Sequence, residues 1–124
     1  MNRTVTDNEL KTHIKKLNGY EYTLLNNVCE HTKVSFNNLV SQIRKPDFVN
    51  ARKIAVYFLM KKGYTLENAG KVISIIPKDH TSVLHLNGKA HDHYKFEPHF
   101  KSIVDNINVM TSTINFTSLK YRKV

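Results

Sequence analysis

The stretch KDHTSVLH, at residues 78–85, decides the fold of this chain. Pro77 precedes it, and proline disrupts a helix interior, so a new helix is expected to begin after Pro77. Asp79 or Thr81 can cap that helix. Gly88 inside it costs about 1 kcal/mol relative to alanine. An apolar face at helical spacing nevertheless extends the helix to about residue 95; it consists of Val83, Leu86 (or Asn87), Ala90 and Tyr94.

A shorter helix is expected just before this one, over residues 66–72, with Thr65 as its cap. Two such helices separated by a tight break have the proportions of a helix-turn-helix, whose second helix presents its N-terminal residues to base edges in the major groove. The side chains of residues 78–82 can each donate a hydrogen bond to a base, accept one from it, or contact a thymine methyl group. Thr81, His85 and Lys89 share one face, away from the apolar face. The other interpretation is a plain, well-capped helix start, which the pattern alone favours slightly.

The rest of the chain also predicts helices. Thr6 and Glu9 have the spacing of a capping box, so a helix is expected over residues 7–18, ended by Gly19. Further helices are expected over 22–32, after Ser35, from Asp47 as N-cap through residue 60, and from residue 98, where proline suits the first turn. The last of these should bury Phe100, Ile103, Val104 and Ile107. The sequence therefore predicts an all-α fold of about six helices.

Three segments are less regular. Residues 41–46 are expected to form a basic loop, residues 73–77 also suit a short strand, and the end of the chain is a basic tail or an edge strand.

We divide the chain into three parts: an N-terminal helical extension (1–27), a helix-turn-helix domain (28–110) and a basic C-terminal tail (111–124).

The composition of the chain limits the classes of partner that it can be expected to bind. The 124 residues carry 19 Lys+Arg against 10 Asp+Glu, a formal charge of +9. This balance favours a polyanionic partner such as nucleic acid or an anionic surface. Cys29 is the single cysteine, so neither an intramolecular disulfide nor a cysteine zinc cluster can form. No apolar run approaches the roughly 20 residues that span a bilayer, and no secretory signal opens the chain, so a cytoplasmic protein is expected.

Enzyme signatures are weak. Gly70-Lys71 is followed by Val72, which does not fit a P-loop. The histidines from His80 to His99 lack the i, i+4 spacing that grips zinc, and no close acidic pair can be placed. Neither an enzyme, a cofactor nor a metal is expected.

Beyond these patterns, residues 28–107 resemble the C-terminal DNA-binding domain of DnaA, the bacterial chromosomal replication initiator. Residues 78–85 are similar to that family's basic-Asp-His-Thr-Thr-Val-Leu-His signature. Arg52 with Ala55 resembles the Arg and Ala of its long helix, and Ala69-Gly70 stands where its Ile-Gly lies. The resemblance implies a DnaA C-terminal-domain or Trp-repressor-like fold around a helix-turn-helix.

The resemblance also implies roles for individual residues. Base contacts would come from Arg44, entering the minor groove, and from Asp79, His80, Thr81 and Ser82 in the major groove. Phosphate contacts, which hold register without reading sequence, would come from Lys45, Arg52, Lys53, Lys78, His85 and Lys89.

Some residues depart from the family pattern. The basic loop has fewer arginines, the turn before residue 78 is longer, and Ser82 replaces a second threonine. The initiator's ATPase module is missing from the chain.

We therefore expect a protein that binds double-stranded DNA with sequence preference, at DnaA-box-like sites in a replication origin or regulatory region. An alternative is an interaction module or competitor that acts on a replication protein. A third possibility, binding of RNA or single strands, would need exposed aromatics for stacking, whereas most Tyr and Phe fall on expected core faces.

Overall fold

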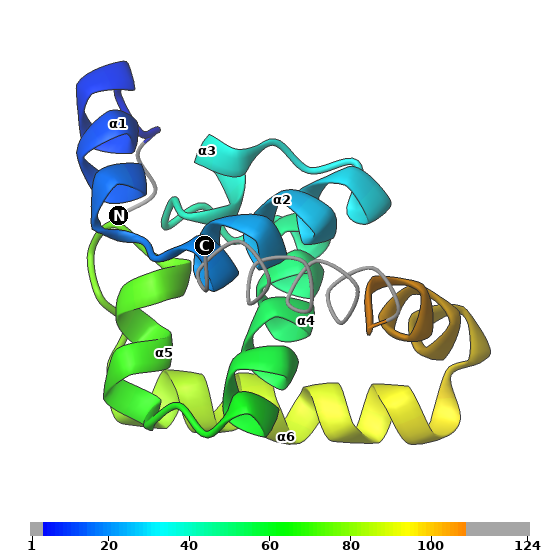
Figure 1. The fold of residues 1–124 in the computed structure, drawn as a ribbon. Helices are drawn as coiled ribbons and strands as arrows, with labels where there is room; N and C mark the ends of the chain where they lie inside the picture. The colour runs from blue at the N-terminus through cyan, green and yellow to red at the C-terminus, as the bar shows by residue number, and fades with distance from the viewer. Residues whose placement is uncertain (1–3, 109–124) are drawn as a thin grey trace, which may run out of the picture.

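A computed structural model describes residues 4–108, and every regular element in that range is a helix (Figure 1). This confirms the predicted all-α class. Seven helices lie in the described range, one in each segment for which a helix was expected, in keeping with a fold of about six: α1 (Asp7–Lys16), α2 (Gly19–Thr32), α3 (Phe36–Leu39), α4 (Pro46–Lys62), α5 (Leu66–Ile73), α6 (His80–Phe96) and a last one over 98–108. The C-terminal tail from 111 lies outside the described residues.

Local capping fixes most of the helix starts. The capping box of Thr6 and Glu9 is present at α1, and Ser35 and Thr65 cap α3 and α5, as predicted. Gly19 was expected to end the first helix, but it is the first residue of α2. The reason is Asn18, which forms a second capping box with Glu21 and so starts a new helix immediately after the first.

Helix α4 is the central element, and α2, α3, α5 and α6 all pack against it. Its N-cap is Lys45 rather than the predicted Asp47, because Pro46 occupies the first turn, where its missing N–H is harmless. At the other end Gly63 adopts a left-handed conformation with φ 104°, which glycine tolerates without strain. Eight α4 residues are buried: Ala51, Arg52, Ile54, Ala55, Val56, Tyr57, Phe58 and Leu59.

Helices α5 and α6 form the helix-turn-helix, joined by residues 74–79. A Cβ added at Gly70 would lie 2.7 Å from the carbonyl oxygen of Lys78 and 3.2 Å from the Val83 side chain, so the close approach of the two helices requires glycine there. The strand considered for 73–77 does not form. Instead Ile73 ends α5, and the N–H of Ile75 donates to the carbonyl of Val40 at 3.0 Å.

The N-terminal helices share the core of the helix-turn-helix. The buried His13 of α1 donates its Nε2–H to the carbonyl of Val72 at the end of α5, over 2.9 Å. The boundary expected after residue 27 falls inside α2, where Leu24, Leu25 and Val28 are all fully buried. A single hydrophobic cluster thus holds the described residues together.

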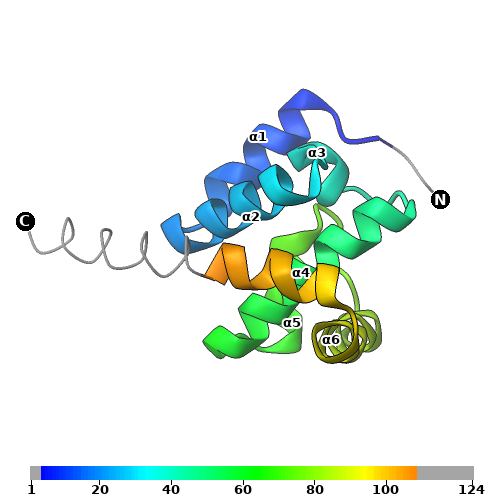
Figure 2. The same cartoon turned by 90° about the vertical axis from the view of Figure 1, so that its right-hand side faces the viewer.

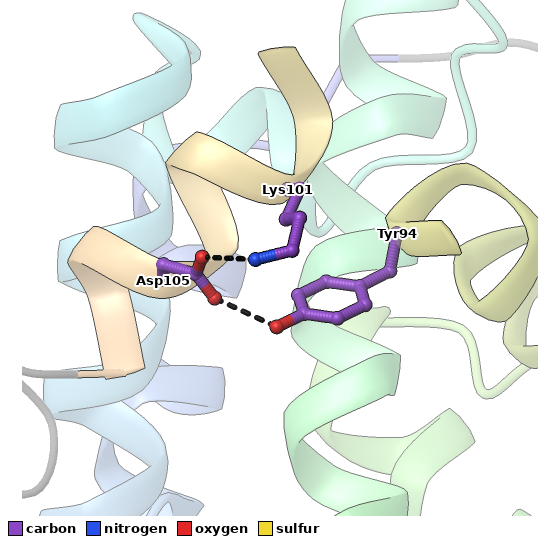
Figure 3. Close-up of polar contacts among 3 residues, drawn as sticks. All are labelled: Tyr94, Lys101 and Asp105. Carbon is purple, nitrogen blue, oxygen red and sulfur yellow. Dashed lines mark hydrogen bonds and ion pairs between the residues drawn. The ribbon is translucent and has the colours of Figure 1, made fainter. Parts of the chain in front are cut away.

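The last helix closes the fold on the side of α6. Figure 2 shows residues 98–108 against α4, between α2 and α6. Phe100, Val104 and Ile107 are buried, as predicted, and Ile103 packs partly buried against the core. Polar contacts fix the geometry (Figure 3): Asp105 accepts from the Tyr94 hydroxyl at 2.8 Å and from the Lys101 ammonium at 2.9 Å. Within 4–108 no helix has the length and apolarity needed to cross a membrane.

Candidate nucleic-acid interface

The start of α6 presents free polar side chains to solvent. Asp79 is the N-cap, and its Oδ1 accepts from the Ser82 N–H at 2.7 Å. That hydrogen bond holds the pKa of Asp79 below its usual range. Since Asp79 takes the capping role that Thr81 could also have filled, the Thr81 hydroxyl has no partner among the described residues. His80 and Thr81 are exposed, and Ser82 is half-buried.

A cationic pocket lies beside this helix start. It has a volume of about 240 Å³ and is lined by Arg44 of the basic loop, Lys78, three residues of α6 (Ser82, His85, Leu86) and two of α4 (Val49, Arg52). None of these lining residues is acidic. Burial, followed by repulsion from Arg52 and Arg44, lowers the pKa of Lys78. Asp79, next to Lys78, partly opposes this change, but the pocket lining itself holds cations and no acidic side chain, which favours an anionic group at this position.

The sequence of these elements matches a family model described as the bacterial DnaA protein helix-turn-helix, over residues 22–89. The match covers more than half of the 124 residues. The chain belongs to the bacterial DnaA helix-turn-helix family. This is a DNA-binding family and not an enzyme family, as expected from the resemblance. No curated protein gives a significant match to the sequence.

The DnaA match contains the basic loop, α4, α5 and the start of α6, which are the elements of the candidate interface. Helix α1 and the helix over 98–108 lie outside it. In this structure these two helices support the DnaA-like unit from outside, α1 through the end of α5 and the last helix through α6.

Arg52 is not accessible to a phosphate group, because its side chain is buried. Its side chain is 1% exposed. Its Nε donates to the carbonyl of Leu39 at 2.6 Å, and Nη2 donates to the carbonyls of Ser41 at 2.7 Å and Asn38 at 3.0 Å. Burial, with the nearby charge of Arg44, lowers its pKa to about 10.

The predicted phosphate role of Arg52 is therefore corrected to a positioning role, in which α4 holds the end of α3 and the start of the basic loop. A sequence signal was present: Arg52 follows Phe48 by four residues and precedes Ala55 by three, so it lies on the core-facing stripe.

The remaining predicted cations lie at two places. Arg44 and Lys45 are exposed in the basic loop, and the Lys45 ammonium lies 5.8 Å from the centre of the Phe48 ring. Lys53 is half-buried further along α4, and its ammonium donates to Nδ1 of His93 at 3.3 Å. Burial lowers the pKa of Lys53, with Glu97 opposing and exposed Lys89 reinforcing the change. Lys53 of α4 and Lys89 of α6 thus lie beyond the pocket, with Glu97 as a nearby counter-charge to Lys53.

Leu84 is a surface residue that sequence reasoning did not single out. Its side chain is 58% exposed on α6, between the start of the helix and Gly88. The signal was its position outside the stripe of Val83, Leu86 and Ala90. An exposed leucine on this face is suited to apolar contact with a thymine methyl.

The histidines remain dispersed in space. Across residues 4–108, His, Cys, Asp and Glu side chains form no group of three that could hold a metal ion. The ring of His93 is instead engaged by Lys53 on one nitrogen and by Glu97 on the other, at 3.2 Å.

Proposed function

We propose that this protein binds double-stranded DNA with sequence preference, with the start of α6 in the major groove. One observation carries the proposal: the exposed side chains of His80 and Thr81 lie beside a pocket. The cationic or basic residues of that pocket include Arg44, Lys78 and His85. Polar groups at a recognition-helix start suit base edges, and neighbouring cations suit the phosphates that border the groove.

The N-cap of α6 and the first three residues of the helix are assigned to bases. Asp79 supplies a carboxylate that can accept from a cytosine amino group, and His80 a ring that can donate or pack on a thymine methyl. Thr81 and Ser82 supply hydroxyls, with the Thr81 methyl as a further apolar contact. Asp79 has a double role in this scheme, because the same carboxylate caps the helix.

The cations are assigned by their location. Lys45, Lys78 and His85 would meet phosphates near the helix start, and Lys53 and Lys89 would meet them further along α6. Arg44, exposed at the tip of the basic loop, would enter the adjacent minor groove, where a narrow A·T-rich segment concentrates negative potential.

The biological setting follows from the family. We infer DnaA-box-like sites in a replication origin or regulatory region as targets, with the protein acting in the cytoplasm. A replication protein is a further partner in this proposal, for which α1 and the basic C-terminal tail are the candidate contacts. Although residues before 28 share one hydrophobic core with the rest, we propose that residues 28–110 carry DNA binding and that 1–27 are a helical extension.

Selection of duplexes from a random pool by the purified full chain tests the proposal. An enriched motif, bound more tightly than a scrambled duplex by at least about tenfold, is the expected result. The matched variants are Thr81→Ala, which should lose the preference, and Lys71→Ala, a lysine on α5 paired with Glu67 at 3.2 Å, which should keep it. If no motif emerges and duplex binding is absent, the protein-interaction alternative replaces this proposal.

A further inference from the structure

The exposed face of α6 carries a glycine that the fold does not require. Gly88 lies inside the helix and is exposed. A Cβ added there would meet no atom within 4 Å, in contrast to Gly70, where the added Cβ would collide with the Lys78 carbonyl. Because glycine weakens a helix interior relative to alanine, Gly88 destabilises α6 without a packing reason within the described residues.

The position of Gly88 around the helix is specific. The buried residues of α6 are Val83, Leu86 and Ala90. At 3.6 residues per turn, Gly88 lies on the opposite side, on the same line as Thr81 two turns earlier. This line is the part of α6 furthest from the core, so it is the first part of the helix to meet a surface placed against it.

Distance and charge indicate which part of the DNA would meet Gly88. Seven residues at about 1.5 Å per residue separate it from Thr81 by roughly 10 Å, while the major groove is about 12 Å wide. If Thr81 meets base edges, Gly88 reaches the strand that borders the groove. Lys89 is the next residue along α6 and is exposed, so its ammonium can reach a phosphate of a strand that lies against Gly88. Exposed Asp92, four residues later on the same face, would repel phosphate and so limits the contact to the part of α6 before it.

We propose that Gly88 is the point of closest approach between α6 and the DNA sugar–phosphate strand, where bare helix backbone contacts the strand and a side chain would hold the helix away. The inference rests on the proposed DNA binding. It makes Gly88 a positioning residue: its missing side chain sets how deeply His80 and Thr81 enter the groove.

The test uses two substitutions and one control in the full chain, with melting temperature and affinity for the selected duplex measured on each. Gly88→Ala should raise the melting temperature by a few degrees, because helix propensity improves, and weaken binding by at least about fivefold. Gly88→Lys should weaken binding further despite its added positive charge. Asn26→Ala, at an exposed position inside α2, should raise the melting temperature slightly and leave affinity unchanged.

The outcomes separate this inference from the proposed function. If the parent binds the selected duplex, Thr81→Ala loses sequence preference, and both Gly88 variants bind as tightly as the parent or more so, the close approach is wrong and DNA binding stands. If Gly88→Lys alone binds more tightly than the parent, the DNA strand lies far enough from α6 to leave room for a lysine side chain. That result also overturns the inference. A parent that binds no duplex overturns both.

Discussion

Helices α4 and α6 are equal in length, at 17 residues each, but the structure uses them differently. Helix α4 buries eight residues, Arg52 among them, whereas α6 buries only Val83, Leu86 and Ala90. A helix that is buried nearly all round serves as scaffold, and one with a wide exposed face is available to a partner. The comparison teaches that the extent of burial separates the helix that serves as scaffold from the helix that is available to a partner.

The cations at the contact between the two helices illustrate the same point. Arg52 of α4 directs its guanidinium to backbone carbonyls, while Lys78, just before α6, is half-buried at the rim of the pocket. Both line one pocket, yet only the residues at its edge are free to meet an incoming anion. Arg52 shapes the site and Lys78 would occupy the interface.

The largest expected effect comes from breaking the scaffold. Arg52→Ala should lower the free energy of unfolding by about 3 kcal/mol, because the carbonyls of Leu39 and Ser41 lose a buried charged donor. Urea unfolding measures this loss. In the folded fraction, the slope of log affinity against log salt should stay at its parental value.

Lys78→Ala is the matched control for Arg52. It should change stability little and reduce the salt slope by roughly 0.9, the contribution of one phosphate contact. If Arg52→Ala reduces the slope and Lys78→Ala does not, the assignment of the two residues is reversed.

The next effect tests the exposed face of α6. His80→Ala and Thr81→Ala should each remove about 1–3 kcal/mol of discrimination at one or two base positions. Melting temperature should be unchanged in Thr81→Ala, because Asp79 rather than Thr81 is the N-cap. Competition binding against single-base variants of the selected site provides the measurement. Parental discrimination in both variants would contradict base reading by this helix.

A smaller effect is expected at the basic loop. Arg44→Ala should weaken binding by about 1 kcal/mol at sites with an A·T-rich flank and less at G·C-rich flanks. Arg44→Lys should restore only part of the loss, since a hydrated ammonium enters a narrow groove less readily than a flat guanidinium. Titrations on probes that differ only in the flank distinguish these cases, and equal losses on both would exclude a minor-groove role.

The smallest effect concerns the cap of α6. The folded pKa of Asp79 is lowered by its hydrogen bond to Ser82, so its carboxylate stabilises the fold above the ordinary aspartate pKa. That stability is lost as pH falls through the folded pKa. The stability difference between the parent and Asp79→Ala should therefore be present at neutral pH and shrink in acid. Thermal melts from pH 7 to 2 check this, and a difference independent of pH would mean that the charge contributes nothing.

Local signals in the sequence anticipated much of the fold. Thr6, Ser35 and Thr65 cap the helices they were expected to cap, and Gly63 ends α4. These features depend on hydrogen bonds between residues two to four positions apart, which the sequence displays directly. The wrong helix boundaries also have local causes. Asn18 caps α2, so Gly19 begins that helix instead of ending the one before it, and Pro46 begins α4 one residue before the predicted N-cap Asp47.

The sequence by itself determined the helical class, because periodicity and capping act within a few residues. The helix-turn-helix and the residues at the start of its second helix came from the resemblance of residues 78–85 to the DnaA family. Only the tertiary structure decided what each cation contacts. The helical spacing of Arg52 indicates that it faces the core, but its hydrogen bonds to the carbonyls of Leu39 and Ser41 appear only in the folded chain. The pocket likewise joins residues 44, 52, 78 and 85 from separate elements, and such contacts depend on packing between distant segments, which no local pattern encodes.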